Sequence, residues 1–270
     1  MSHSTTHRPR KRFGQNFLHD QNVIQRIVNA IHPQRDQHLV EIGPGQGALT
    51  TQLLPLMGVM DAVELDRDLL EPLQEKCASL GQLNLHSADA LKFDYCQLYN
   101  PEEQKLRIVG NLPYNISSPL LFHLMTQRHC IKDLHFMLQK EVVQRITAQP
   151  GNGHYGRLSI MLQYFCETEM LFTVSPGSFF PPPKVDSAVF RLIPRQAPLL
   201  KAENETLLSR IVSISFGQRR KTIRNNLKGT IDETTLRELN IEPGLRPERL
   251  EIEQFVQLAN WLHDNKKENI

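Results

Sequence analysis

The chain has 270 residues, of which 40% are hydrophobic, so it can form one large domain with an ample core and a second, smaller domain. It contains no run of about 18 apolar residues, and the sequence therefore predicts no membrane-spanning helix. Its polar, basic N-terminus also lacks the apolar stretch of a secretory signal. We accordingly expect a cytoplasmic protein.

The formal net charge is only +2, but the basic residues are unevenly distributed. One basic patch lies near the N-terminus and comprises Arg8, Arg10, Lys11 and Arg12. A second lies between residues 206 and 231, a stretch without any acidic residue, and comprises Arg210, Arg219, Arg220, Lys221, Arg224 and Lys228. Two such patches in a nearly neutral chain favour a polyanionic partner, although solvated charge runs would produce the same pattern.

The four cysteines are far apart in the sequence, at Cys77, Cys96, Cys130 and Cys166. No Cys-x-x-Cys pair occurs, so their spacing indicates neither a zinc site nor a disulfide framework. We therefore expect no bound metal and a reducing compartment.

Strands and helices alternate along the first two thirds of the chain. In chain order, the hydrophobic pattern predicts helix 23–31, strand 38–42, helix 48–57, strand 59–65, helix 68–80, strand 84–87, strand 106–109, helix 119–127, strand 134–138 and helix 141–148. A buried helix at 159–165 follows, and strands 170–174 and 188–193 are expected to form an antiparallel hairpin at one edge. This alternation predicts an α/β fold with a parallel, twisted sheet.

Strand signals end near residue 195. Helices are expected at 207–216, 221–227, 233–239 and 248–263. We therefore predict three parts: a basic N-terminal arm at 1–19, an α/β domain at 20–198 and a small all-helical domain at 199–270.

A glycine-rich loop, Glu41-Ile42-Gly43-Pro44-Gly45-Gln46-Gly47, joins the strand at 38–42 to the next helix. Glycine tolerates positive φ and lets the backbone approach a ligand closely, which indicates a nucleotide-bearing cofactor. The same stretch satisfies G-x-G-x-x-A through Gly43, Gly45 and Ala48. The loop alone therefore does not distinguish NAD from S-adenosylmethionine.

Three acidic residues at strand ends refine this choice. Glu64, about twenty residues beyond the loop, can accept hydrogen bonds from ribose hydroxyls. Asp89, after the third strand, can accept a hydrogen bond from the amine of an adenine ring. Glu41 is a poor neighbour for a pyrophosphate but a suitable one for a sulfonium or an α-amino group, which favours S-adenosylmethionine.

A second motif, Asn111-Leu112-Pro113-Tyr114, ends the strand at 106–109. An exocyclic adenine amine becomes nucleophilic when both of its N–H bonds point at fixed acceptors. The side-chain carbonyl of Asn111 and a backbone carbonyl near Leu112 or Pro113 could be those acceptors. Tyr114 offers a ring for stacking, worth about 1–3 kcal/mol per base. Without the glycine loop, an Asn-initiated turn would explain the motif equally well.

Taken in order, the motifs closely resemble the bacterial KsgA-type family of small-subunit ribosomal RNA adenine dimethyltransferases. The resemblance covers nearly the whole chain and rests on Phe13-Gly14-Gln15-Asn16-Phe17-Leu18, the glycine loop, Glu64-Leu65-Asp66, Ala88-Asp89-Ala90, Asn111-Leu112-Pro113-Tyr114-Asn115-Ile116-Ser117, Phe179-Phe180-Pro181-Pro182-Pro183-Lys184-Val185-Asp186-Ser187 and Phe216-Gly217-Gln218-Arg219-Arg220-Lys221. It implies a Rossmann-like class I methyltransferase sheet followed by the small all-helical domain.

The resemblance also implies an activity and its residues. S-adenosylmethionine would donate two methyl groups to N6 of each of two adjacent adenosines near the 3′ end of 16S rRNA. The implied cofactor contacts are Asn16, Leu18, Gly43, Glu64, Asp89 and Asn111. The implied catalytic residues are Asn111, Leu112, Tyr114 and Phe179, with the base held between the two aromatic rings. Phe180 receives no role.

The target base must leave its stack to reach such a pocket. We expect RNA contacts, mainly with phosphates, from Arg10, Lys11, Arg12, Arg219, Arg220, Lys221 and Arg224. The expected partner is 16S rRNA within a 30S assembly intermediate, and we expect a monomer because no extended apolar helix face is exposed.

Three other functions remain open from the sequence. A related enzyme that methylates large-subunit rRNA and confers macrolide resistance would share the fold and the Asn-x-Pro-Tyr motif, although the segment from Phe216 and the C-terminal helices argue against it. An NAD-dependent oxidoreductase would use the glycine loop but would leave Asn111–Tyr114 unexplained. A non-catalytic ribosome assembly factor would need only the basic patches.

Overall fold

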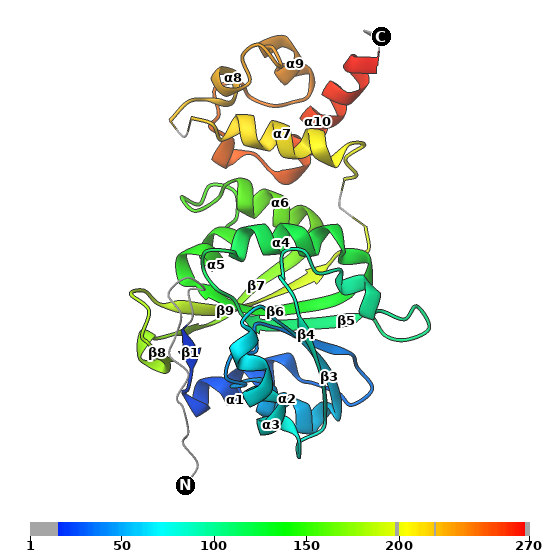
Figure 1. Ribbon diagram of the computed structural model, residues 1–270. Coiled ribbons are helices and arrows are strands. Elements are labelled where there is room, and N and C mark those ends of the chain that lie inside the picture. The colour runs from blue at the N-terminus through cyan, green and yellow to red at the C-terminus, as the bar shows by residue number, and fades with distance from the viewer. Residues whose placement is uncertain (1–15, 198–199, 219, 268–270) are drawn as a thin grey trace. The chain divides into compact units, whose positions relative to one another are not determined.

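The computed structural model describes residues 16–197, 200–218 and 220–267 (Figure 1). The chain divides into two compact units. The first comprises Met1–Val143 and Glu169–Pro194, and the second comprises Gln144–Thr168 and Arg195–Ile270. Within the described residues, no helix is long and apolar enough to cross a lipid bilayer.

The first unit is built on a seven-stranded sheet with strand order β4-β3-β2-β5-β6-β9-β7. The strands are β2 (Leu39–Ile42), β3 (Val59–Glu64), β4 (Gln82–Ser87), β5 (Leu106–Asn111), β6 (Ile131–Gln139), β7 (Cys166–Val174) and β9 (Ser187–Pro194). The pairs β2–β3, β2–β5, β3–β4 and β5–β6 are parallel, whereas β9 runs antiparallel to β6. The predicted α/β class, the parallel strands and the late strands at one edge are confirmed.

Helices cover both faces of this sheet. The elements α1 (Gln21–Ile31), α2 (Thr50–Met57) and α3 (Leu70–Cys77) lie on one face, and α4 (Ser117–Thr126) lies on the other (Figure 1). A short 3-10 turn, η2 (Arg67–Leu69), precedes α3. Because both faces are covered, the interior strand β2 is buried along its whole length, including the carboxyl group of Glu41.

The second unit is mainly helical. Its elements are α6 (Arg157–Phe165), α7 (Glu205–Ser215), α8 (Ile223–Asn226), α9 (Glu233–Glu238), η6 (Pro247–Arg249) and α10 (Ile252–Lys267), while α5 (Lys140–Ile146) spans the division. We expected the helical domain to begin at residue 199. Residues 144–168 nevertheless group with it, because α6 packs against α7 and α10.

A two-stranded antiparallel sheet, unforeseen from the sequence, joins the start of the described chain to a distant motif. It pairs β1 (Phe17–Leu18) with β8 (Phe179–Phe180), which follows the turn η5 (Pro176–Ser178). Asp20 caps α1 by accepting hydrogen bonds from the Asn22 and Val23 amides. It also accepts one from Ser178 Oγ at 3.1 Å. The segment around Asn16 is thereby fixed beside the 178–180 segment.

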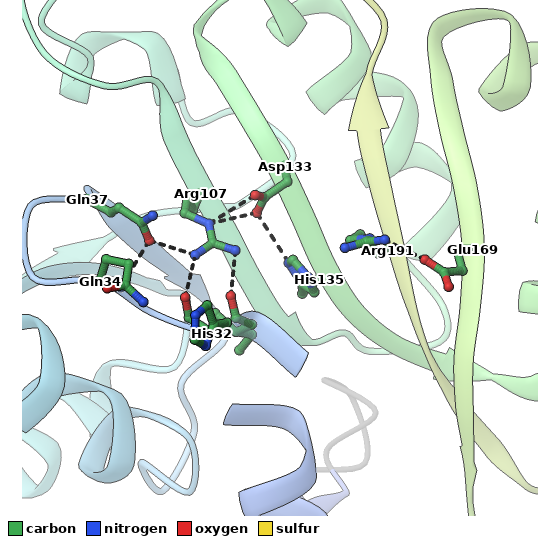
Figure 2. Close-up of polar contacts among 9 residues, drawn as sticks. His32, Gln34, Gln37, Arg107, Asp133, His135, Glu169 and Arg191 are labelled. Carbon is green, nitrogen blue, oxygen red and sulfur yellow. Dashed lines mark hydrogen bonds and ion pairs between the residues drawn. The ribbon is translucent and has the colours of Figure 1, made fainter. Parts of the chain in front are cut away.

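The guanidinium of Arg107, at the start of β5, ties α1 to the sheet (Figure 2). Arg107 is buried, and its Nε donates to both oxygens of Asp133 on β6 at 3.1 and 3.0 Å. Its two terminal nitrogens donate to the carbonyls of His32 and Ile31 at 3.3 and 2.6 Å. A cation that binds the last carbonyls of a helix also complements the negative end of the helix dipole.

Burial alone would raise the pKa of Asp133, but His135 and Arg107 hold this pKa below its usual value. His135 Nδ1 lies 3.3 Å from an Asp133 oxygen. The carboxylate is therefore ionised at neutral pH and fully paired with the guanidinium.

The structure corrects one expectation about the cysteines. Cys96 and Cys130, separated by 34 residues, form a disulfide. Cys96 lies in η3 (Tyr95–Leu98) and Cys130 ends η4 (Arg128–Cys130). Sequence spacing gave no sign of this pair because tertiary folding alone brings the two turns together. Cys77 and Cys166 are buried and outside any disulfide.

We predict that Arg107→Ala lowers the free energy of unfolding by about 3–5 kcal/mol, because it removes the guanidinium that pairs with the buried carboxylate of Asp133. The matched control is Arg191→Ala, which removes the 2.6 Å ion pair with Glu169 on the same sheet (Figure 2). That pair is exposed, so its loss should cost less than about 1 kcal/mol. Urea unfolding measures both values, and equal losses would contradict the anchoring role of Arg107.

Candidate active site

A cavity of about 370 Å³ opens in the first unit at the carboxyl ends of the parallel strands. It lies where β2 meets β5, the point at which strand order reverses and where open α/β sheets bind ligands. All six residues predicted to contact the cofactor line it: Asn16, Leu18, Gly43, Glu64, Asp89 and Asn111. They come from five separate segments, so the fold brings together what the sequence scatters.

The glycine loop has a backbone that requires glycine. Gly43 and Gly45 have φ values of 66° and 57°, in the left-handed region. A Cβ atom on Gly45 would lie 3.2 Å from the Phe17 ring. The Gly45 amide donates to Glu64 Oε2 at 3.1 Å. The loop therefore packs closely against both the N-terminal segment and the end of β3.

Glu64 is held rigidly at its strand end. Its second oxygen accepts the Asp66 amide at 2.8 Å, in addition to the bond from Gly45. Burial raises the pKa of Glu64, against the opposing effect of these hydrogen bonds. Asp89 similarly accepts the Leu91 amide at 3.0 Å. Both carboxyl groups are thus oriented by backbone donors in the lining of the cavity.

Glu41 reaches the same cavity from inside β2. Its Oε2 accepts a hydrogen bond from Thr50 Oγ1 at 2.7 Å, and both residues are buried. Burial raises the pKa of Glu41 to about 7, despite the hydrogen bond from Thr50. In the protein without a ligand, this carboxyl group therefore keeps its proton to a higher pH than an exposed glutamate does.

The Asn111–Tyr114 motif also lines the cavity. Asn111 Nδ2 donates to the backbone carbonyl of Asn16 at 3.0 Å, which leaves Oδ1 on the other side of the amide. The Leu112 amide donates to Met137 O at 3.2 Å, so the backbone of the motif is fixed to β6. Tyr114 is half-buried, and its hydroxyl lies 2.8 Å from Ser187 Oγ.

Phe179 is the one predicted catalytic residue that the structure does not bring to the cavity. Its side chain is 2% exposed and belongs to the buried hydrophobic cluster that includes Leu18 and Val189. Successive side chains of a strand point to opposite faces, and the neighbouring Phe180 is accordingly 65% exposed. The expected sandwich of a base between Tyr114 and Phe179 is therefore not assembled in this structure.

The predicted RNA-contacting residues are only partly described. Arg10, Lys11, Arg12 and Arg219 lie outside the described residues. Arg220 and Lys221 are exposed in the second unit. Arg224 is also exposed, but its Nη1 donates to Glu233 Oε2 at 2.9 Å, so an acid just beyond the acid-free stretch partly neutralises it.

Sequence reasoning missed two residues of this site. Leu65 lines the cavity beside Glu64 and is 51% exposed, which suits an apolar contact with a ligand ring. The position of Leu65, directly after the acid that ends the strand, was the sequence signal that could have identified it. Ser187 is fully buried and contacts Tyr114, but no local pattern could have paired two residues 73 positions apart.

Comparison with known proteins relates this site to one family. A sequence model described as "Ribosomal RNA adenine dimethylase" matches residues 6–264. The chain is 54% identical to the ribosomal RNA small subunit methyltransferase A of Marinomonas sp., covering 97% of this chain and 98% of that protein. It is 52% identical to the protein of the same name from Pseudomonas putida, covering 99% and 100%.

Solved structures agree with the sequence comparison. A dimethyladenosine transferase from Plasmodium falciparum superposes with a TM-score of 0.79 at 27% identity, covering 93% of this chain and 98% of that chain. The 23S rRNA methyltransferase ErmE superposes with a TM-score of 0.71, also at 27% identity, covering 92% and 100%. Both neighbours share the methyltransferase fold expected from the sequence. With the family model matched over nearly its entire length, the chain belongs to the ribosomal RNA adenine dimethylase family.

Proposed function

We propose that this protein uses S-adenosylmethionine to dimethylate N6 of two adjacent adenosines near the 3′ end of 16S rRNA, within a 30S assembly intermediate. One observation carries the proposal: a single cavity contains the Asn111–Tyr114 motif together with all six expected cofactor residues. The relatives named small subunit methyltransferase A, at 52–54% identity, favour the small subunit over the large-subunit activity in the name of ErmE. We place the reaction in the cytoplasm and assign it to a monomer.

The residues of the cavity suit this cofactor. Glu64 and Asp89 sit at successive strand ends, as needed to bind a ribose and an adenine amine, and Leu65 offers an apolar surface for the ring. Glu41 can balance a positive sulfonium or α-ammonium group. Bound S-adenosylmethionine would supply an electrophilic methyl group that needs only an in-line nucleophile.

The protein must then present the adenine amine. Oδ1 of Asn111, directed away from Asn16, and the Leu112 backbone carbonyl are the proposed acceptors for its two N–H groups. These acceptors localise the lone pair on nitrogen and fix its direction of approach, and such positioning can supply a large share of the acceleration. Because Asn111 contacts Asn16 through its amide nitrogen, the same side chain links the cofactor segment to the base.

Tyr114 is the proposed stacking surface for the flipped base. Its bond to Ser187 orients the ring. For Phe179 to cover the other side of the base, it must leave the apolar cluster in which it is now buried. We infer that RNA binding rearranges the β1–β8 pair, which carries both Leu18 and Phe179.

The decisive test of the substrate is methyl incorporation from labelled S-adenosylmethionine. We expect undermethylated 30S subunits to accept the label and large-subunit RNA to accept none. Asn111→Ala should reduce transfer by about 10²–10³-fold, as the loss of a preorganised polar group at a reacting centre does, while cofactor affinity falls far less.

The matched control for this variant is Asn22→Ala, on the exposed surface of α1, which should behave as wild type. Labelling of large-subunit RNA alone would refute the proposed substrate. Equal losses of transfer and cofactor affinity in Asn111→Ala would refute the role given to Asn111.

Glu41 predicts a pH-dependent cofactor affinity. A positive ligand favours the ionised carboxylate, and with a pKa of about 7 this group must lose a proton on binding below pH 7. Affinity should therefore rise by up to about tenfold between pH 6 and pH 8. Glu41→Gln keeps an acceptor for the Thr50 hydroxyl, but its cofactor affinity should not show this rise with pH. Calorimetry measures the cofactor affinity of both proteins from pH 6 to pH 8. Because titration of the ligand itself affects both proteins equally, the ratio of the two affinities reports the contribution of Glu41. A ratio that does not change with pH would contradict this prediction.

Phe179 can be tested without emptying its buried position. Phe179→Leu keeps an apolar side chain, so unfolding stability should fall by less than about 1.5 kcal/mol. If the ring stacks on the base, methyl transfer should fall by roughly 5- to 150-fold, corresponding to about 1–3 kcal/mol. Phe180→Leu is the neighbouring control and should transfer at the wild-type rate. An unchanged rate of methyl transfer in Phe179→Leu would show that Phe179 serves only in packing the hydrophobic core.

A further inference from the structure

A cluster of three metal-ligating side chains lies in the first unit, outside the cavity. Cys96, His129 and Cys130 place their donor atoms within 4.8 Å of one another. His129 Nε2 lies 3.4 Å from Cys96 Sγ, so the imidazole already faces the sulfur. Nothing in the proposed methyl transfer uses these residues.

Hydrogen bonds of Gln127 hold the backbone around this cluster in place independently of the disulfide. Gln127 Oε1 accepts the amides of Tyr95 and Cys96 at 2.6 and 3.3 Å. Gln127 Nε2 donates to Phe93 O at 3.2 Å, and the Gln127 carbonyl accepts the Cys130 amide at 3.2 Å. The three side-chain bonds of Gln127 hold the segment 93–96 against the start of η4, and the Cys130 amide closes the η4 turn on the same residue. After reduction, both thiols would therefore remain beside His129.

Two thiolates and one imidazole form a ligand set that zinc accepts. Zn²⁺ prefers sulfur and nitrogen donors in a tetrahedron, and a site with three protein ligands takes water as the fourth. Cys130 is fully buried and Cys96 partly buried, which shields the sulfurs, whereas His129 is exposed and offers a path for the ion. The Gln127 carbonyl lies 3.1 Å from Cys130 Sγ and 3.5 Å from Cys96 Sγ, where it can accept hydrogen bonds from the thiols of the reduced, metal-free protein.

We propose that Cys96, His129 and Cys130 bind one Zn²⁺ ion, or a similar thiophilic divalent ion, when the disulfide is reduced. Reduction by a phosphine and water converts the disulfide to two thiols and the phosphine to its oxide. Binding of the ion then releases the two thiol protons. The disulfide and the metal complex exclude each other, so the cluster has two alternative cross-linked states.

The place of the cluster puts the ion away from the proposed methyl-transfer site. Cys130 directly precedes β6, which runs parallel to β5, so it lies at the amino edge of the sheet, opposite the cavity. The η3 segment links the cluster to the cavity. In this segment the hydroxyl of the buried Tyr95 donates a hydrogen bond to Ala90 O at 3.2 Å, next to Asp89. The ion would therefore restrain this segment without meeting the substrate.

Cobalt spectroscopy on the full-length chain tests the proposal. The protein is reduced with a water-soluble phosphine, freed of it without oxygen, and titrated with Co²⁺. We expect one equivalent to bind with a thiolate-to-cobalt absorption band, to be displaced by Zn²⁺, and to be absent from the oxidised protein. Cys96→Ser and Cys130→Ser should each lose the band.

His129→Ala keeps both cysteines and should weaken Co²⁺ binding at least about tenfold. The control is His154→Ala, an exposed histidine of the second unit, which should bind Co²⁺ as wild type does. Circular dichroism shows whether each variant folds, and the two histidine variants decide the question if the cysteine variants do not. Absence of the band in the reduced protein, or equal Co²⁺ affinity in the two histidine variants, would overturn the three-residue site.

Discussion

The hydrogen bond from Asn111 Nδ2 to the carbonyl of Asn16 is the constraint on which the site depends. A primary amide has one donor side and one acceptor side, so committing its nitrogen decides where its oxygen points. This one bond therefore directs Oδ1, the proposed acceptor for the adenine amine, away from Asn16, and it holds Asn16, a proposed cofactor contact, in the lining of the cavity.

That bond is in turn held by features distant from it. Arg107 fixes the last turn of α1 to β5, and Asp20 fixes the first turn to Ser178. Because α1 is tied at both ends, the preceding residues 16–18 have a fixed position relative to β5, whose last residue is Asn111. The β1–β8 pair adds Phe179 to the same assembly. Three separate sequence motifs are thus connected to one another, although Phe179 itself lies outside the lining of the cavity.

The sequence allowed the sheet and much of the site to be predicted because each rests on local signals. Strand and helix periods, turn glycines and acids at strand ends are all properties of short segments. What was missed depends on tertiary contact: two-residue strands β1 and β8 have no period, and Cys96 and Cys130 meet only after folding. Phe179 pairs with Leu18 and is buried in the same apolar cluster, a contact that motif spacing does not encode. Likewise, Arg224 donates a hydrogen bond to Glu233, which lies just beyond the acid-free stretch at 206–231.

The most direct test of this account is the structure of the protein bound to S-adenosylhomocysteine and an RNA that carries the target adenosine. We predict that the adenine amine lies within hydrogen-bond distance of Asn111 Oδ1 and of the Leu112 carbonyl, with Asn111 Nδ2 still bonded to Asn16. An Asn111 amide turned the other way, or an adenine bound without contact to residues 111–114, would contradict it.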